Sequence, residues 1–175
     1  MSNYTIDASH SNVGFSVRHM MISNVRGEFQ QYSGEFSYDA AKPEATSARV
    51  TIELASINTR DEKRDGHLRS GDFFDVEHHP QMTFVSKSAA ARGNGLDMVG
   101  DLTIRGTTRE VTLRVEDITD ENKDPWGNLR RGASASTKIK RSDFGIVWNA
   151  GLEAGGVLVS DEVKIHLDIQ GTRQA

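Results

Sequence analysis

The sequence predicts an all-β fold, an antiparallel barrel of about eight strands with one short helix. Apolar and polar residues alternate with period two along most of the chain, which is typical of strands with one buried and one wet face. Several alternating runs reach about ten residues, so these strands should be roughly 33 Å long. Eight strands enclose just enough room for side chains or for one ligand.

Small residues at inward positions favour a barrel with space for a ligand over a packed sandwich. Close approach of neighbouring walls is the other use of such residues. The small inward positions are Gly27, Gly34, Ala48, Gly100, Ala133 and Ala135.

The first strand is predicted within "SNVGFSVRHM", where Val13, Phe15 and Val17 share one face. The same face continues into His19 and Met21, an imidazole and a flexible thioether. We therefore expect the inward face of this strand to become more polar and more flexible near its end.

The second alternating run changes parity. Its apolar residues occupy odd positions up to Phe29 and even positions over 32–38, so residues 30–33 should hold a bulge or bend in one long strand. Further alternation predicts strands over 48–54, 82–84, 96–104, 111–115, 133–139 and 163–169. In the last of these strands, the residues that should face inward are Val163, Ile165, Leu167 and Ile169.

One helix is predicted within "RDEKRDGHLRS", residues 60–70. Thr59 stands three residues before Glu62, which is the spacing of a capping box, and Gly71 suits the position just past a helix end. Leu68 is its only large apolar residue, so the helix should lie on the surface or across an opening of the barrel. The apolar stretch "DFFDV" follows almost at once.

Length and composition predict a single domain over residues 1–175. A net charge of -4 with interspersed charges argues against a nucleic-acid partner, and the absence of cysteine excludes disulfides. No stretch approaches the roughly 18 to 20 apolar residues of an integral membrane segment. The opening "MSNYTIDASH" lacks the basic and apolar regions of an export signal, so we expect a cytoplasmic protein, or a periplasmic one if Met1 is not the native start.

Several segments resemble the YceI-like family, the lipid- or polyisoprenoid-binding bacterial proteins. In chain order these are "YTIDASHSNVGFSVRHM", "VRGEF", "NTRDEKRDGHLRSGDFFDVEHHPQMTF", "GDLTIRGTTREVTLRV", "RSDFGI" and "DEVKIHLDIQG". The resemblance implies a lipocalin-like, extended eight-stranded antiparallel barrel with a long apolar channel for a prenyl chain or similar lipid. It also implies binding, storage or transport of that lipid without a shared reaction, and many members are secreted to the periplasm.

The candidate ligand-binding residues are mostly large inward apolar side chains. Each of them alone is equally well explained as ordinary core, whereas the set predicts a lining for a long-chain isoprenoid or fatty lipid. His19 is interpreted either as a hydrogen-bonded residue at the barrel rim or as a head-group contact, and His67 and Asp72 as head-group contacts beside the helix. The full set is Phe15, Val17, His19, Met21, Phe29, Phe36, Leu54, His67, Leu68, Phe73, Phe74, Phe84, Met98, Leu102, Leu113, Phe144 and Trp148.

Two alternatives to a lipid carrier stay open at this level. An enzyme acting on a lipid-like substrate would use His19 or His67 as its acid–base group, and an interaction protein would fill the barrel with its own side chains. The sequence has no nucleophile elbow, zinc-protease or phosphate-loop motif, so we predict a non-enzymatic protein without catalytic residues. His78 and His79 lack a metal-ligand spacing, so no metal and no cofactor other than a bound lipid is expected.

The remaining motifs are interpreted as surface features. Lys138, Lys140 and Arg141 fit a solvated outer face, with contact to a phosphate-bearing lipid as the alternative. Trp126 in "KDPWGN" fits an aromatic residue packed at a loop, with a place at one end of the channel as the alternative. Strand edges exposed at an imperfect barrel seam would favour a homodimer.

Overall fold

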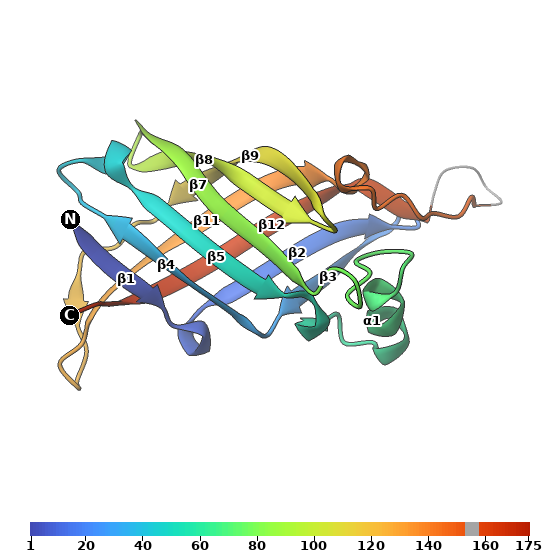
Figure 1. The fold of residues 1–175 in the computed structure, drawn as a ribbon, viewed down its shortest axis with the longest axis horizontal. Coiled ribbons are helices and arrows are strands. Elements are labelled where there is room, and N and C mark those ends of the chain that lie inside the picture. Colours follow the sequence, from blue (N-terminus) through green and yellow to red (C-terminus); the bar gives the residue numbers. More distant parts are fainter. Residues whose placement is uncertain (153–157) are drawn as a thin grey trace.

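The computed structural model describes residues 1–152 and 158–175, which form one antiparallel sheet curled into a barrel (Figure 1). Its strands are β1 (Ser2–Ile6), β2 (Asn12–His19), β3 (Ser23–Phe29), β4 (Tyr32–Tyr38), β5 (Ser47–Glu53), β6 (Ile57–Asn58), β7 (Gln81–Arg92), β8 (Gly95–Ile104), β9 (Thr107–Glu116), β10 (Asn122–Lys123), β11 (Leu129–Lys140) and β12 (Val159–Arg173). The helix is α1 (Glu62–Arg69), and short 3-10 helices are η1 (Ala8–His10), η2 (Pro43–Ala45), η3 (Leu54–Ser56) and η4 (Arg141–Phe144).

Eight of these strands form a closed ring. Their order around the ring is β11, β9, β8, β7, β5, β4, β1 and β12, and β12 pairs again with β11. The closing ladder joins residues 130–140 of β11 to residues 162–172 of β12, so these two strands leave no free edge at the seam. The predicted fold class, an eight-stranded antiparallel barrel with one short α-helix, is confirmed.

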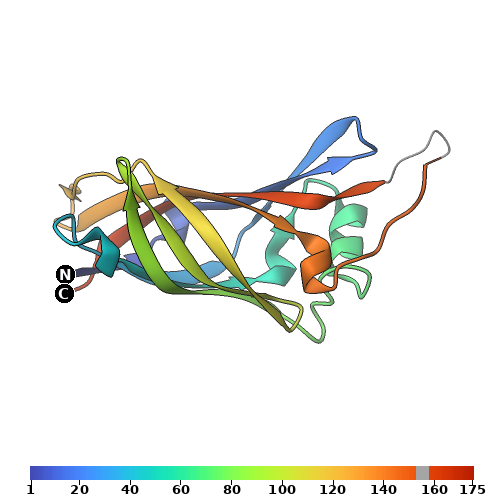
Figure 2. The ribbon, with the colours of Figure 1, turned by 90° about the horizontal axis from the view of Figure 1, so that it is seen from above.

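The β2–β3 hairpin extends the wall beyond this ring. One edge of β12 pairs with β1 through residues 171–173 and with β2 through residues 159–168, so β2 continues the wall where β1 ends. Figure 2 shows the hairpin projecting at the end of the barrel that holds α1, while the N- and C-termini lie together at the opposite end.

The parity change near residue 30 marks two strands and not one bent strand, so that prediction is wrong. β3 ends at Phe29 and pairs with β2 and β6, whereas β4 begins at Tyr32 and pairs with β1 and β5. Between them, the backbone N–H groups of Gln30 and Gln31 donate to the Ser56 hydroxyl. Because these donors are taken by η3, the β3 ladder cannot continue.

Several small inward residues serve close packing of the wall. The Phe15 ring lies over Gly27, its cross-strand partner, and the Phe84 ring lies over Gly100, so a Cβ at either glycine would fall 2.4–2.5 Å from a ring atom. At these positions the wall-closure interpretation holds and the ligand-space interpretation is wrong. The phenylalanine rings lie along the wall and thereby leave the centre of the barrel open.

The predicted helix forms, but its caps differ from the prediction. Asp61 is the N-cap residue, because its side chain accepts hydrogen bonds from the backbone N–H groups of residues 63 and 64. Thr59 is instead buried and donates from its backbone N–H and its hydroxyl to Asp65, at 2.9 and 2.5 Å. The helix ends at Ser70 in an extended conformation, so Gly71 supplies no left-handed cap.

A glycine packed against the wall and a glycine in the open helix predict opposite effects of an added methyl group on the free energy of unfolding. At Gly34 a Cβ would lie 2.4 Å from the backbone oxygen of Arg49, so Gly34→Ala should lower the free energy of unfolding by about 1–3 kcal/mol. At Gly66, inside α1, nothing lies within 4 Å, so Gly66→Ala should raise it by up to about 1 kcal/mol. Urea denaturation of the two variants measures both; equal midpoints would contradict the close wall contact.

Candidate ligand-binding cavity

The barrel encloses a cavity of about 250 Å³. One water has a share of about 30 Å³ in the liquid, so this is room for roughly eight water-sized groups, more than the ~150 Å³ of a cavity that binds one benzene ring. The lining comes from every strand of the ring and from β2, β3 and α1. In β12 its members include Val163, Ile165, Leu167 and Ile169, as the alternation predicts.

The cavity wall is almost entirely carbon. Among the described residues, no His, Asp, Glu or Lys side chain lines it, and its charged members are Arg131 and Arg141. These two arginines lie at opposite ends of β11, about 33 Å apart along an extended strand. The cavity is therefore an apolar tunnel with one cation near each end.

Most of the predicted ligand-binding residues line this tunnel. They are Phe15, Val17, Phe29, Phe36, Leu68, Phe73, Phe74, Phe84, Met98, Leu102, Leu113 and Phe144. The alternation did not single out the tunnel residues at its two ends, because Ile6, Thr46 and Ile146 lie at or beyond the ends of the regular strands.

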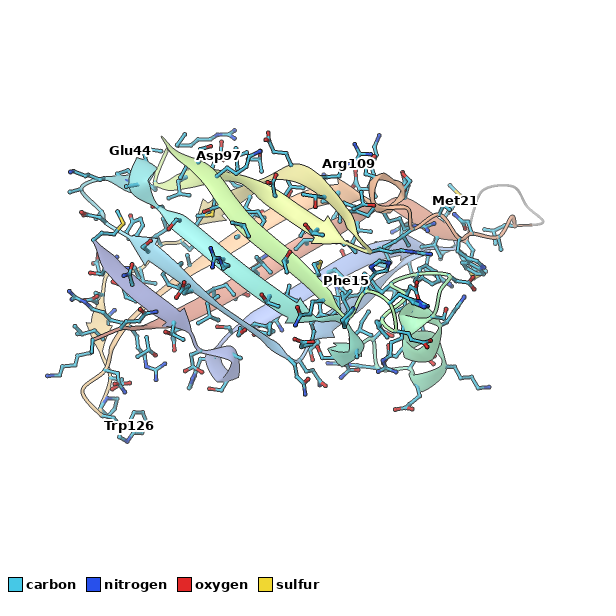
Figure 3. The ribbon with its side chains drawn as sticks, viewed as in Figure 1. Phe15, Met21, Glu44, Asp97, Arg109 and Trp126 are labelled. Carbon is cyan, nitrogen blue, oxygen red and sulfur yellow. The ribbon has the colours of Figure 1, made fainter. Side chains whose placement is uncertain are left out.

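The structure places five predicted residues outside the lining. Leu54 is fully buried in η3, and Met21 is 58% exposed at the tip of the β2–β3 hairpin (Figure 3). His19 ends β2 opposite Ser23, on the part of the hairpin that extends beyond the ring. His19 and Met21 share the parity of Phe15. His19 still pairs with Val159 of β12, but beyond the register shift of that ladder neither residue lines the tunnel.

His67 and Trp148, the other two, form a layer behind the tunnel wall at the α1 end. The His67 ring meets Phe73 and Trp148 edge-on, with ring centroids 4.9 and 4.6 Å apart, and its Nε2 lies 2.9 Å from Asp72 Oδ2. Phe73 lines the tunnel and separates His67 from it. Leu68 and the residues after α1 thus cover this end of the barrel (Figure 1).

Arg141 stabilises the same end from inside, which corrects its assignment to the outer face. Lys138 and Lys140 are exposed, but the chain turns into η4 after β11, so Arg141 points inward and is 7% exposed. Its guanidinium donates to four backbone oxygens, those of Ile146, Trp148, Val159 and Ser160, at 2.8–3.1 Å. Burial lowers the pKa of Arg141 from its ordinary value.

At the opposite end Arg131 lies among tyrosines. Its Nε donates to the Tyr4 hydroxyl at 3.1 Å and its Nη1 to the Thr119 backbone oxygen at 2.7 Å. The guanidinium stacks 4.9 Å from the centre of the Tyr38 ring. The Tyr4 hydroxyl in turn donates to Glu121 at 2.6 Å, which lowers the pKa of that carboxyl.

Arg130 stabilises the outside of this end. It donates to Asp7 at 2.7 Å and to Asp124 at 2.8 Å, joining the turn after β1 to the β10–β11 turn. Asp124 also accepts from the backbone N–H of Trp126, whose side chain is 81% exposed at the tip of that turn (Figure 3). Trp126 is therefore not a packed aromatic residue, contrary to the prediction.

The fold and its cavity define a class of protein: an extended, closed antiparallel barrel with an apolar internal tunnel. The chain belongs to the YceI family, whose YceI-like domain matches residues 4–171. It is 39% identical over 176 residues to a UPF0312 protein of Ectopseudomonas mendocina, covering 99% of this chain and 88% of that protein.

Two solved structures are similar over nearly the whole chain. The crystal structure of Burkholderia cenocepacia BcnA has a TM-score of 0.81 and 29% identity, covering 94% of this chain and 98% of that one. The structure of a polyisoprenoid binding domain from Saccharophagus degradans has a TM-score of 0.70 and 18% identity, covering 98% of both chains, and shows likeness of fold.

The part of the chain that the structure describes contains α1 and four short 3-10 helices. None of its helices is long and apolar enough to cross a bilayer. Nowhere in it do three His, Asp or Glu side chains gather closely enough to hold a metal ion.

The Arg130 ion pairs predict a stability change at acid pH. Arg130 is the main cause that lowers the pKa of Asp124 to about 2, and hydrogen bonds from Ser9 and then Arg130 lower the pKa of Asp7. Carboxyls with lowered pKa stabilise the fold fully above their ordinary pKa of about 4, and that stabilisation is lost as the pH falls through the folded-state values. The urea midpoint should therefore fall between about pH 4 and pH 2.

The variant Arg130→Met should flatten this acid slope, because neither carboxyl then gains the guanidinium. Arg49→Met is the control, since Arg49 is an exposed arginine of β5 without an ion pair within the described residues. The same slope in Arg130→Met as in the wild-type protein would show that these pairs do not contribute.

Proposed function

We propose that this protein binds one long-chain lipid in the tunnel and stores or carries it without chemically changing it. The lipid we propose is a polyisoprenoid, or an isoprenoid quinone or phosphate. The observation that carries the proposal is the internal cavity with an almost entirely apolar wall, because an apolar chain inside it is removed from water.

The size of the hydrophobic term favours long chains. Each buried methylene contributes about 0.8 kcal/mol, so ten carbons supply about 8 kcal/mol against an association cost of about 4–15 kcal/mol. A short chain does not offset that cost, whereas a chain that fills the tunnel does. Specificity then follows from tunnel length and width, and Met82 and Met98 in the wall adapt to different chain shapes.

The positions of the histidines support a carrier over an enzyme. The enzymatic alternative needs His19 or His67 in contact with the bound lipid, but His19 lies on the projecting hairpin and Phe73 separates His67 from the tunnel. The proposal agrees with the Saccharophagus degradans structure, a polyisoprenoid binding domain of similar fold.

A bulky side chain inside the tunnel should abolish lipid retention. Ala135 lines the tunnel from β11, and its neighbour Ser136 is exposed on the outer face. We expect solvent extraction of the purified wild-type protein and mass spectrometry to yield a long-chain lipid at about one per chain. Ala135→Phe should reduce this amount at least about tenfold, because the added ring occupies the space of several methylenes.

Ser136→Phe is the matched control, since it adds the same ring to the same strand outside the barrel. It should retain the wild-type amount of lipid, and circular dichroism should show the same fold for both variants. Equal retention in the two variants would mean that the lipid does not lie in the tunnel.

A further inference from the structure

Unused polar groups gather at one end of the apolar tunnel. Tyr38 at the end of β4, Thr46 just before β5 and Arg131 near the start of β11 all line the cavity. Tyr38 follows Ser37 and Thr46 precedes Ser47, and these two serines are cross-strand partners. The Arg131 guanidinium stacks on the Tyr38 ring. This is the end of the barrel where the two termini lie (Figure 1).

The Thr46 hydroxyl is the first unused group. Its oxygen is buried and has no hydrogen-bond partner in the described part of the chain. Buried hydroxyls almost always find a partner, because losing water without a replacement is costly. A hydroxyl left over beside a ligand cavity indicates that its partner is an atom of the ligand.

Arg131 is the second. A guanidinium has five N–H donors, of which Arg131 uses one for Tyr4 and one for Thr119. Among residues 1–152 and 158–175, the other three N–H donors of Arg131 have no acceptor. No carboxylate oxygen of these residues lies within 4.0 Å of its guanidinium nitrogens. Glu121 is already occupied, because it accepts from the Tyr4 hydroxyl and from Arg173.

Arg141 at the other end differs in this respect. Four of its five N–H donors bind backbone oxygens, so it holds the chain together and has little left for a ligand. The two cations of the tunnel are therefore not equivalent. Only the Arg131 end has several free N–H donors, so the two ends of the tunnel differ chemically.

We propose that Arg131 and Thr46 bind the anionic oxygen head group of the lipid, a carboxylate or a phosphate, and that the tail runs from there toward α1. The proposal rests on the proposed lipid-binding function. The free N–H groups of Arg131 match the paired oxygens of either anion, and stacking on Tyr38 keeps the guanidinium in place. The Thr46 hydroxyl donates to a further oxygen.

The direction of the tail is tested with stearate carrying a nitroxide at carbon 5 or carbon 16. The variant Trp126→Phe leaves Trp148 as the only tryptophan, and Trp148 lies behind the tunnel wall at the α1 end. The carbon-16 nitroxide should quench Trp148 fluorescence more strongly than the carbon-5 nitroxide. Stronger quenching by the carbon-5 probe would show that the head group lies at the α1 end, and it would overturn the proposal.

The head-group contacts are tested with stearate, octadecyl phosphate and octadecanol. The wild-type protein should bind one or both anions at least about tenfold more tightly than the alcohol, and the tighter anion identifies the source of the head group. Arg131→Met should bring the three affinities within about twofold of one another, because the anions lose their charged hydrogen-bond donor. Arg49→Met, which removes an arginine outside the tunnel, should keep the preference.

Thr46→Val separates ligand binding from folding. Because the hydroxyl has no partner in the free protein, its replacement by a methyl group should not lower the melting temperature, yet it should weaken anion binding about threefold to tenfold. Equal wild-type affinity for anions and alcohol would overturn the head-group site alone. If octadecanol and both anions fail to bind, the tunnel proposal falls together with it.

Discussion

The ladder between β11 and β12 is the constraint on which the rest of the structure depends. It joins eleven residues of one strand to eleven of the other and turns a curled sheet into a ring. Once the ring is closed, the backbone donors and acceptors of its strands are paired through the wall itself. The centre of the barrel then needs no filling to satisfy hydrogen bonds, and the hollow becomes compatible with a stable fold.

The wall also provides most of its own packing. Phe15 and Phe84 lie over glycines of the neighbouring strands, so their apolar area is buried against the sheet and not in the middle of the barrel. In the middle of β11 the inward residues Ala133 and Ala135 are small and line the tunnel. Large residues that lie flat and small residues that face them produce one long channel.

Local alternation explains how much could be predicted. The inward faces of β8 over residues 96–104 and of β12 over residues 163–169 follow from period two alone, because more buried and more exposed positions alternate regularly there. The same reasoning fails where pairing changes. Alternation alone continues the inward face of Phe15 into His19 and Met21, because the sequence does not show where the β2–β12 ladder shifts register. It places Arg141 on the surface, because the sequence does not show that η4 turns the chain after β11.

The residues at the tunnel ends could not be predicted from the sequence, because pairing between distant strands brings them together. Arg131 and Thr46 come to line the same cavity only through closure of the ring, and neither stands in a motif whose spacing suggests a site. A charged residue at an inward position of an otherwise small-residue strand was the available signal, since Arg131 shares its parity with Ala133 and Ala135.

The central position of β12 also has a consequence for how the protein is made. This last strand pairs with β11, β1 and β2, and its residue 173 meets residue 4. During synthesis the ring therefore stays open until residue 173 has left the ribosome, with the edges of β1 and β11 free to meet other chains. Contacts so distant in sequence slow folding, so the edges of β1 and β11 stay unpaired for longer than the edges of a sheet that is held by local contacts.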